Sequence, residues 1–282
     1  MKKRIAGKGP LAGLRIVLTR TPEGNERFEA RLAAAGAEIL QVPLIAIEGV
    51  SKPDGADEIF AQFGNYDWLV FTSASGVRHF MDVFLARFGD IRSLGLVRLV
   101  AIGRGTADAL AAYHLQADLV PEKATAQGVF DALKEDDEIE NRNFLMAVGT
   151  LNDPWLAEVL ENAGGMVDRI CVYSTRAVEP AGADWERFLR EGADAIVFSS
   201  ASAVKAYLAA GDRMKVSSKG CAPLFCSIGP VTTDALRCGG LAVQVQADEA
   251  SPEGILDALV KRLASGAEPA PVPAPKAKGG RR

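Results

Sequence analysis

The sequence has few of the residues that bind metal ions or form disulfide bonds. Its 282 residues include four cysteines and two histidines, and no two cysteines form a CxxC pair. Structural and catalytic metal sites need several such ligands at close spacing, so we expect no metal site. No export signal is evident, which predicts reduced thiols in a cytoplasmic protein.

Long apolar runs and the common nucleotide and nucleophile motifs are also missing. No stretch approaches the ~18 apolar residues of a membrane helix, so we expect no membrane partner. There is no GxxxxGK[ST] loop and no serine in a GxSxG elbow, which excludes P-loop nucleotide binding and that class of hydrolase. Gly103-Arg-Gly105 resembles the start of a dinucleotide loop, but the third glycine would fall at Asp108.

Positive charge is scarce outside the two chain ends. The net charge is −4, yet residues 1–13 and 266–282 together hold eight basic residues and one acidic residue. Removing them from the totals of 32 basic and 36 acidic residues leaves 24 and 35, a net charge of −11. Such a core predicts no nucleic-acid partner. We expect both ends, a basic N-terminus and a Pro/Ala/basic tail, to be disordered.

Short apolar runs alternate with helical patterns along the rest of the chain. This alternation is typical of βα units around parallel sheets, and it predicts an α/β fold. Fully apolar runs indicate strands that are covered on both faces. The predicted strands are Arg15–Thr19, Trp68–Thr72, Arg98–Ile102, Phe144–Val148, Ala195–Ser199, Leu224–Ile228 and Ala242–Gln246.

The chain also repeats itself at a long interval. Three segment pairs lie 126 or 127 residues apart, and a looser fourth pair matches 32–39 with 160–167. A period of this length indicates two similar domains rather than a solenoid. The three closer pairs are Phe71–Met81 with Phe198–Leu208, Val100–Leu110 with Cys226–Leu236, and Ala126–Leu133 with Pro252–Leu259.

The order of the repeated pieces predicts how the chain connects the domains. One domain is expected from residues 14–38 plus 179–265, and the other from 48–167. Extended segments 39–47 and 168–178 would then form a two-stranded linker, with a cleft between the two domains. A plain tandem of halves divided near residue 140 remains an alternative.

Hydroxyl groups and glycines recur where predicted strands give way to helices. Each such residue could be an ordinary helix N-cap. However, ligands of open parallel sheets bind beyond the carboxyl ends of the strands, where helix N-termini favour anions. We therefore predict binding of an anionic small molecule there. The candidates are Thr72, Ser73, Ser75, Gly103, Thr106, Gln127, Gly128, Ser199, Ser200, Ser202, Gly229, Thr232 and Thr233.

Several of these motifs, in this order and spacing, resemble the uroporphyrinogen-III synthase family over residues 12–264. They are Thr19-Arg20, Phe71–Val77, Ile102-Gly103 with Thr106, Val172–Thr175, Phe198–Ser202 and Ser227–Leu236. The sequence departs from many relatives at Ser200-Ala201, where they carry a proline or a similar rigid residue.

The resemblance implies two flavodoxin-like domains, a substrate cleft, no cofactor and a cyclising lyase of tetrapyrrole biosynthesis. The implied substrate is hydroxymethylbilane, a linear tetrapyrrole with eight carboxylates. Loss of its hydroxyl group as water gives an electrophilic azafulvene. Attack by ring D gives a spiro intermediate, which fragments and closes again with ring D inverted.

Tyr173 is our candidate catalytic residue. It lies in the second extended segment, and the equivalent repeat position holds Ile45, so the repeat itself does not require a phenol. Its hydroxyl group could assist departure of the substrate hydroxyl, although an ordinary packing tyrosine remains an alternative. Thr106 and Thr232 could bind carboxylates, and Arg20 could pair with a substrate acid or with a surface acid.

Two other classes stay open at this point. A hinged two-domain protein could bind a small anion or a sugar without catalysis, and a glycosyl transferase could use two similar domains. Nothing in the sequence marks a subunit interface, so we expect a monomer.

Overall fold

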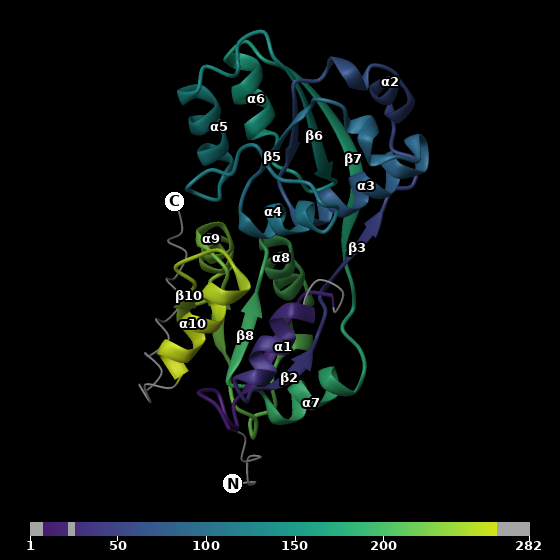
Figure 1. Cartoon of the computed structure of the whole chain (residues 1–282). Coiled ribbons are helices and arrows are strands. Elements are labelled where there is room, and N and C mark those ends of the chain that lie inside the picture. The colour runs from purple at the N-terminus through teal and green to yellow at the C-terminus, as the bar shows by residue number, and fades with distance from the viewer. Residues whose placement is uncertain (1–7, 22–25, 264–282) are drawn as a thin grey trace, which may run out of the picture. The chain divides into compact units, whose positions relative to one another are not determined.

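The protein is described here by a computed structural model that covers residues 8–21 and 26–263 (Figure 1). The chain divides into two compact units. Unit 1 contains the described residues up to Ala46 and those from Arg176 onward, and unit 2 contains Ile47–Thr175. No helix among the described residues is long and apolar enough to span a membrane.

Unit 1 is a five-stranded sheet with the order β2-β1-β8-β9-β10, in which every neighbouring pair is parallel. In the order in which the chain forms them, these strands run 2-1-3-4-5, the order of flavodoxin-like folds. The strands are β1 (Arg15–Leu18), β2 (Glu38–Gln41), β8 (Ala195–Phe198), β9 (Leu224–Ser227) and β10 (Val245–Gln246). The helices are α1 (Glu26–Ala34), α7 (Ala183–Glu191), α8 (Ala201–Ala210), α9 (Pro230–Cys238) and α10 (Pro252–Leu263).

Unit 2 has the strand order β3-β7-β6-β4-β5. Its strands are β3 (Ile45–Gly49), β4 (Trp68–Phe71), β5 (Arg98–Ala101), β6 (Asn143–Gly149) and β7 (Met166–Ala177). Its helices are α2 (Ala56–Ala61), α3 (Ala74–Phe88), α4 (Arg104–Ala111), α5 (Ala126–Glu135) and α6 (Trp155–Asn162). The strands from β7 to β5 are parallel, and a bridge from Val100 to Leu119 extends the sheet. The sequence repeat matches β6 and β7 with β1 and β2, and β4 and β5 with β8 and β9. Unit 2 therefore has the same spatial order of strands, but β6 and β7 follow β4 and β5 in the chain instead of preceding them.

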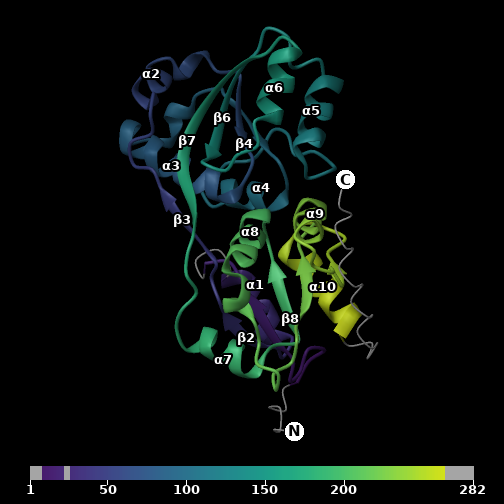
Figure 2. The same cartoon turned by 180° about the vertical axis from the view of Figure 1, so that it is seen from behind.

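Helices cover both faces of each sheet, as the fully apolar strands predict. In unit 2, one core joins the sheet to α2, α3 and α4, and another joins it to α5 and α6. Figures 1 and 2 show these helix groups on opposite sides of the sheet. In unit 1, α1 and α10 cover one face, and α7, α8 and α9 cover the other.

The sequence repeat reappears in the hydrogen bonds that join neighbouring strands. In each unit, two side chains accept a bond from the backbone N–H at the start of an adjacent strand. The donors and acceptors sit at equivalent places, so the two scaffolds are held by the same contacts. The pairs are Asp67 with the Asn143 N–H and Asp194 with the Arg15 N–H, each at 2.8 Å, then Asp118 with the Leu99 N–H at 2.7 Å and Gln244 with the Phe225 N–H at 2.8 Å.

The segments 39–47 and 168–178, the two strands of the expected linker, also take part in the sheets. Residues 39–41 lie in β2 and pair with β1, and residues 168–173 lie in β7 and pair with β6. Beyond these pairings, β3 and β7 lie side by side (Figures 1 and 2). The Val50 N–H binds the Val172 carbonyl and the Val178 N–H binds the Leu44 carbonyl, each at 2.9 Å, so these two segments run antiparallel.

The expected disorder of residues 1–13 is wrong for residues 8–13. These residues form turns, and Leu11 is fully buried with its N–H bound to the Ala35 carbonyl at 2.9 Å. An apolar side chain in a basic segment thus packs against the end of α1. Residues 1–7 and the predicted tail, 266–282, lie outside the described residues.

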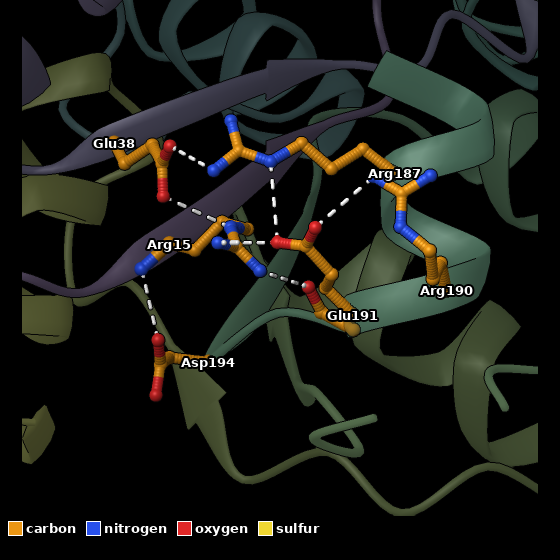
Figure 3. A network of polar contacts seen from close by, with 7 residues as sticks. Arg15, Glu38, Arg187, Arg190, Glu191 and Asp194 are labelled. Carbon is orange, nitrogen blue, oxygen red and sulfur yellow. Dashed lines mark hydrogen bonds and ion pairs between the residues drawn. The ribbon is translucent and has the colours of Figure 1, made fainter. Parts of the chain in front are cut away.

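A network of ion pairs lies at the end of the unit 1 sheet where its strands begin (Figure 3). Arg15 at the start of β1 binds Glu38 of β2 and Glu191 of α7, each at 3.0 Å. Arg187 contacts the same two carboxylates, and Arg190 binds Glu191 at 3.0 Å. These contacts join two strands and a helix, which leaves the carboxyl ends of the strands for other roles.

Glu138 supplies a similar contact in unit 2 and provides a test of the fold. Its carboxylate accepts a 2.6 Å hydrogen bond from Arg98, which lowers the pKa of Glu138, and it lies 3.3 Å from Arg142. We expect Glu138→Gln to lower the thermal midpoint at pH 7. A lowered folded-state pKa stabilises the fold above the unfolded glutamate pKa of about 4.3, and this contribution is lost as the pH falls.

The melting curves of Glu138→Gln and the wild type should therefore converge in acid. Glu135→Gln, at an exposed position on α5, is the control and should have little effect at any pH. A difference for Glu138→Gln that widens as the pH falls would contradict this account.

Candidate functional site

In each unit, several helices begin at the edge where the parallel strands end, which we call the carboxyl edge. In unit 2 these include α3, α4 and α5, and in unit 1 they include α8, α9 and α10. The first turn of a helix leaves backbone N–H groups without a partner inside the helix. Their partial positive charge suits carboxylates and phosphates.

The outer helices of each set are capped by a hydroxyl group from the preceding residue. A cap of this kind stabilises its helix by ~1 kcal/mol and occupies one of the free N–H groups. The capping bonds run from the Gly76 N–H to Ser73 at 2.9 Å, Gly128 to Thr125 at 3.0 Å, Ala203 to Ser200 at 3.3 Å, and Gly254 to Ser251 at 3.0 Å.

The middle helices, α4 and α9, begin without a side-chain cap. They start at Gly103 and Gly229, which have no side chain to accept a bond. Thr106 and Thr232 lie in the first turns and are only 5% and 4% exposed, yet neither hydroxyl has a hydrogen-bond partner among the described residues. Each unit therefore presents an uncapped helix N-terminus beside an unpartnered threonine hydroxyl, the arrangement that best suits an anion.

Thr233, the neighbour of Thr232, has a different role. Its hydroxyl group contacts the Ser227 hydroxyl and the Gln246 side-chain carbonyl, each at 2.6 Å, and the side chain is 1% exposed. These bonds join β9, α9 and β10 inside unit 1. The Thr233 hydroxyl is therefore already used within unit 1, unlike that of Thr232.

Three further predicted residues, Ser75, Gln127 and Ser202, already have side-chain contacts within their own unit. Arg78 donates to Ser75 at 3.3 Å, the Gln127 amide donates to Asp131 at 2.7 Å, and the Ser202 and Ser200 hydroxyls lie 2.9 Å apart. Gly128 leaves space for the backbone, since a Cβ atom there would lie 2.1 Å from the Lys123 carbonyl oxygen. A ligand would have to replace these partners.

Three other predicted residues lie immediately beyond strands, where we expected them. Thr72 follows β4, Ser199 follows β8 and Arg20 lies just past β1, and all three are half-buried. Their roles in substrate binding stay predictions.

Tyr173 lies next to one of the capped helices. It is half-buried on β7, and its hydroxyl group is 3.1 Å from the Ser73 hydroxyl. Ser73 Oγ accepts from the Gly76 N–H, so the serine can use its own proton to donate to the phenol oxygen. The phenol is then free to donate its proton to another molecule. Two residues that are far apart in the sequence thus meet at the N-terminus of α3.

His79 on α3 is a neighbour of Tyr173 that the sequence did not suggest. The two rings have centroids 5.9 Å apart, with 35° between their planes. Burial lowers the pKa of His79, against the opposing effect of Asp82, so the ring is mostly neutral at pH 7. At pH 7 this side chain therefore adds little positive charge to the surroundings of the phenol.

The described residues contain no group of three or more His, Cys, Asp or Glu side chains that could hold a metal ion. None of the four cysteines is assigned to a disulfide bond. Burial raises the pKa of the Cys226 thiol to about 12, whereas Cys221 and Cys238 are exposed.

The protein is a two-domain α/β protein with a doubly wound, mainly parallel sheet in each unit. Its uncapped helix N-termini and hydrogen-bonded phenol suit an anionic ligand. Comparison with known families assigns it more narrowly. The model of the family described as uroporphyrinogen-III synthase HemD matches residues 26–257, so the chain belongs to this family.

Two individual relatives match most of the chain. The chain is 26% identical over 256 residues to the uroporphyrinogen-III synthase of Synechococcus elongatus, with 89% of this chain and 96% of that protein covered. It is 24% identical to the porphyrin biosynthesis protein HemD of Ruminiclostridium josui over 90% of this chain, which spans 49% of that protein.

Solved structures share the fold. A uroporphyrinogen III synthase variant from Thermus thermophilus matches with a TM-score of 0.59 and 21% identity, covering 89% of this chain and 99% of that chain. The uroporphyrinogen-III synthetase of Helicobacter pylori matches with a TM-score of 0.55 and 16% identity, covering 88% and 99%. The mixed α/β fold with two parallel-dominated sheets is therefore confirmed.

The contrast between Thr232 and Thr233 gives a test of the site. Valine keeps the shape of threonine, so Thr233→Val should lower the free energy of unfolding by about 1–3 kcal/mol by leaving the buried Ser227 hydroxyl without this partner. Thr232→Val should change stability little, because its hydroxyl group has no partner to lose. Chemical denaturation of both variants measures this, and equal losses would show that Thr232 is also a structural residue.

Proposed function

We propose that the protein converts hydroxymethylbilane to uroporphyrinogen III, with loss of water and inversion of ring D. The observation that carries this proposal is the family match, which spans residues 26–257 and so includes both units. The reaction belongs to tetrapyrrole and haem biosynthesis, and the enzyme is a cyclising lyase. The family match supports this function over a hinged binding protein without catalysis.

The geometry around Tyr173 suits the first chemical step. The pyrrole nitrogen expels the hydroxymethyl oxygen, which leaves as water once it receives a proton. We propose that the Tyr173 phenol donates this proton or a hydrogen bond to the departing oxygen. Its contact with the Ser73 hydroxyl at 3.1 Å supports this role, because Ser73 can hold the phenol oxygen in place. The azafulvene that remains is the electrophile that ring D attacks.

The substrate carboxylates require anchors in a core of net negative charge. We propose that the uncapped N-termini of α4 and α9, with the hydroxyls of Thr106 and Thr232, bind two of them. The capped junctions at Ser73 and Ser200, together with Thr72, Ser199 and Arg20, supply weaker contacts. Such local dipoles attract a carboxylate without lysine side chains, and they fix its position more closely than a flexible cation does.

Several finer expectations follow from this function. The reaction neither oxidises nor reduces the substrate, so we propose that the enzyme needs no cofactor. The exposed thiol of Cys238 suits a reducing, cytoplasmic environment, which we propose for the enzyme. The exposed large apolar residues include Leu96, Leu151 and Val231, which lie on separate segments, and this scatter supports a monomer.

Distributed anchoring predicts modest losses from single changes. Thr106→Ala and Thr232→Ala should each lower kcat/KM by the equivalent of about 1–2 kcal/mol, because one hydrogen bond to a charged group is lost. Ser93→Ala, at an exposed position away from the carboxyl edge, is the control. Complete inactivation of a folded Thr106 or Thr232 variant would show that binding depends on one contact instead.

The isomer of the product tests the function itself. Hydroxymethylbilane closes spontaneously to the type I ring, so the wild-type protein should give the type III isomer, as measured by chromatography of the oxidised products. Tyr173→Phe should slow this reaction by ~10²–10⁴-fold, the usual contribution of a general acid. Its product should remain type III, because the anchors set the orientation of ring D.

Two outcomes would contradict this assignment. Formation of type I alone by the wild-type protein would reject the proposed reaction. A near-normal rate for Tyr173→Phe, after correction for spontaneous closure, would remove Tyr173 from the chemical step.

A further inference from the structure

The Tyr173 ring lies against a glycine at the end of β6. A Cβ atom on Gly149 would lie only 2.4 Å from Cε2 and Cζ of Tyr173, so any other residue would displace the ring. The Gly149 backbone is not in the left-handed region, and an alanine could adopt it. A glycine is therefore needed at position 149 because the Tyr173 ring fills the space of a side chain, and not because of the backbone conformation.

An irregularity in the pairing of β6 with β7 brings the tyrosine to this place. Val148 pairs with Cys171, but Gly149 pairs with Tyr173, so Val172 is an extra residue. Alternation along a regular strand would put Val172 and Tyr173 on opposite faces. Here both pack against the same core, the one beneath α3, as expected at a β-bulge that re-aims a side chain.

This placement makes the contact with Ser73 possible. The cap of α3 lies on the face that Tyr173 reaches through the bulge, and the hydroxyl groups are 3.1 Å apart. His79 of the same helix lies beside the ring, with 5.9 Å between the centroids. The ring is thus held by a glycine in the sheet and by two side chains of one helix.

Unit 1 contains no equivalent arrangement. The repeat matches Tyr173 with Ile45 and Gly149 with Thr21, since Phe144 and Ile16 pair with the equivalent residues Trp68 and Ala195. The shared scaffold therefore forms without the glycine and the phenol. Their presence together in unit 2 calls for a reason other than folding.

We propose that Gly149 and the adjacent bulge are a positioning device for the Tyr173 phenol. Gly149 is a positioning residue, because it acts on the substrate only through Tyr173. The inference rests on the proposed function, in which the phenol assists departure of the substrate hydroxyl. It adds that the rate depends on a space in β6 that holds the ring against Ser73.

The test is Gly149→Ala, with Gly239→Ala as a matched control. A Cβ atom on Gly239 would lie 2.4 Å from Cδ1 of Leu208, so the closest approach is the same, but it involves an exposed side chain with no proposed role. Gly149→Ala should lower kcat by about 10²-fold with little change in KM, because a catalytic group moved by ~1 Å can lose that much rate. Gly239→Ala should leave both constants near normal.

A double-mutant cycle separates positioning from general damage. In the Tyr173→Phe background, Gly149→Ala should reduce kcat little further, because the phenol that it displaces is already absent. If the double variant instead lost kcat by the product of the two single-variant factors, the proposal would be overturned. A loss of kcat for Gly149→Ala no larger than that for Gly239→Ala would also overturn it.

Thermal unfolding tests the contact between Gly149 and the Tyr173 ring without measuring activity. It can therefore be used even if Gly149→Ala is too unstable for kinetic assays. In the Tyr173→Ala background the crowded ring is gone, so Gly149→Ala should have almost no effect on the midpoint, whereas it should lower the midpoint of the wild type. Equal effects in both backgrounds would overturn the proposal. Gly149→Ala could lower the midpoint only when Tyr173 is present, in a protein that forms no type III product. That result would reject the proposed function but would still support the contact between Gly149 and Tyr173.

Discussion

The backbone N–H groups in the first turn of an α-helix have no partner within that helix, and this constraint shapes the candidate site. Parallel strands end at one edge of a sheet, so the helices that follow them present these groups together. Serine and threonine hydroxyls cap α3, α5, α8 and α10, whereas α4 and α9 begin at glycines and stay uncapped. A core with excess negative charge can thus bind a polycarboxylate through directed dipoles.

The two units share a scaffold and differ in their chemistry. The strand-joining bonds of Asp67 and Asp194 have the same length and lie at equivalent places. Tyr173, by contrast, is matched by the buried Ile45 in unit 1. Repetition therefore explains how the chain folds, and the departure from repetition at Tyr173 supports the catalytic role that we propose for it.

The sequence predicted the parallel strands well because apolar runs covered on both faces are a local signal. Six of the seven predicted strands match observed strands to within one residue at each end, and only 242–246 is longer than the observed β10. Residues 8–13 were misjudged because their basic composition concealed Leu11, whose burial depends on contact with α1.

The site was less predictable because its geometry depends on contacts between distant segments. The hydroxyl-rich junctions look alike in the sequence, which does not distinguish Thr232 from Thr233. Only the structure shows that the Thr233 hydroxyl donates to the Gln246 side chain. The meeting of Tyr173 with Ser73 depends on a bulge between β6 and β7, and no local pattern reveals a change of register. A glycine at the end of an apolar strand was the one available signal.

The central claim is that helix N-termini hold the substrate while one phenol meets its leaving group. A crystal structure of the protein with a bilane that carries a methyl group in place of the hydroxymethyl group would test it most directly. The account predicts carboxylates within hydrogen-bond distance of the first-turn N–H groups of α4 and α9, and the terminal methyl group next to the Tyr173 oxygen. Carboxylates bound away from these helices, or a methyl group remote from Tyr173, would contradict it.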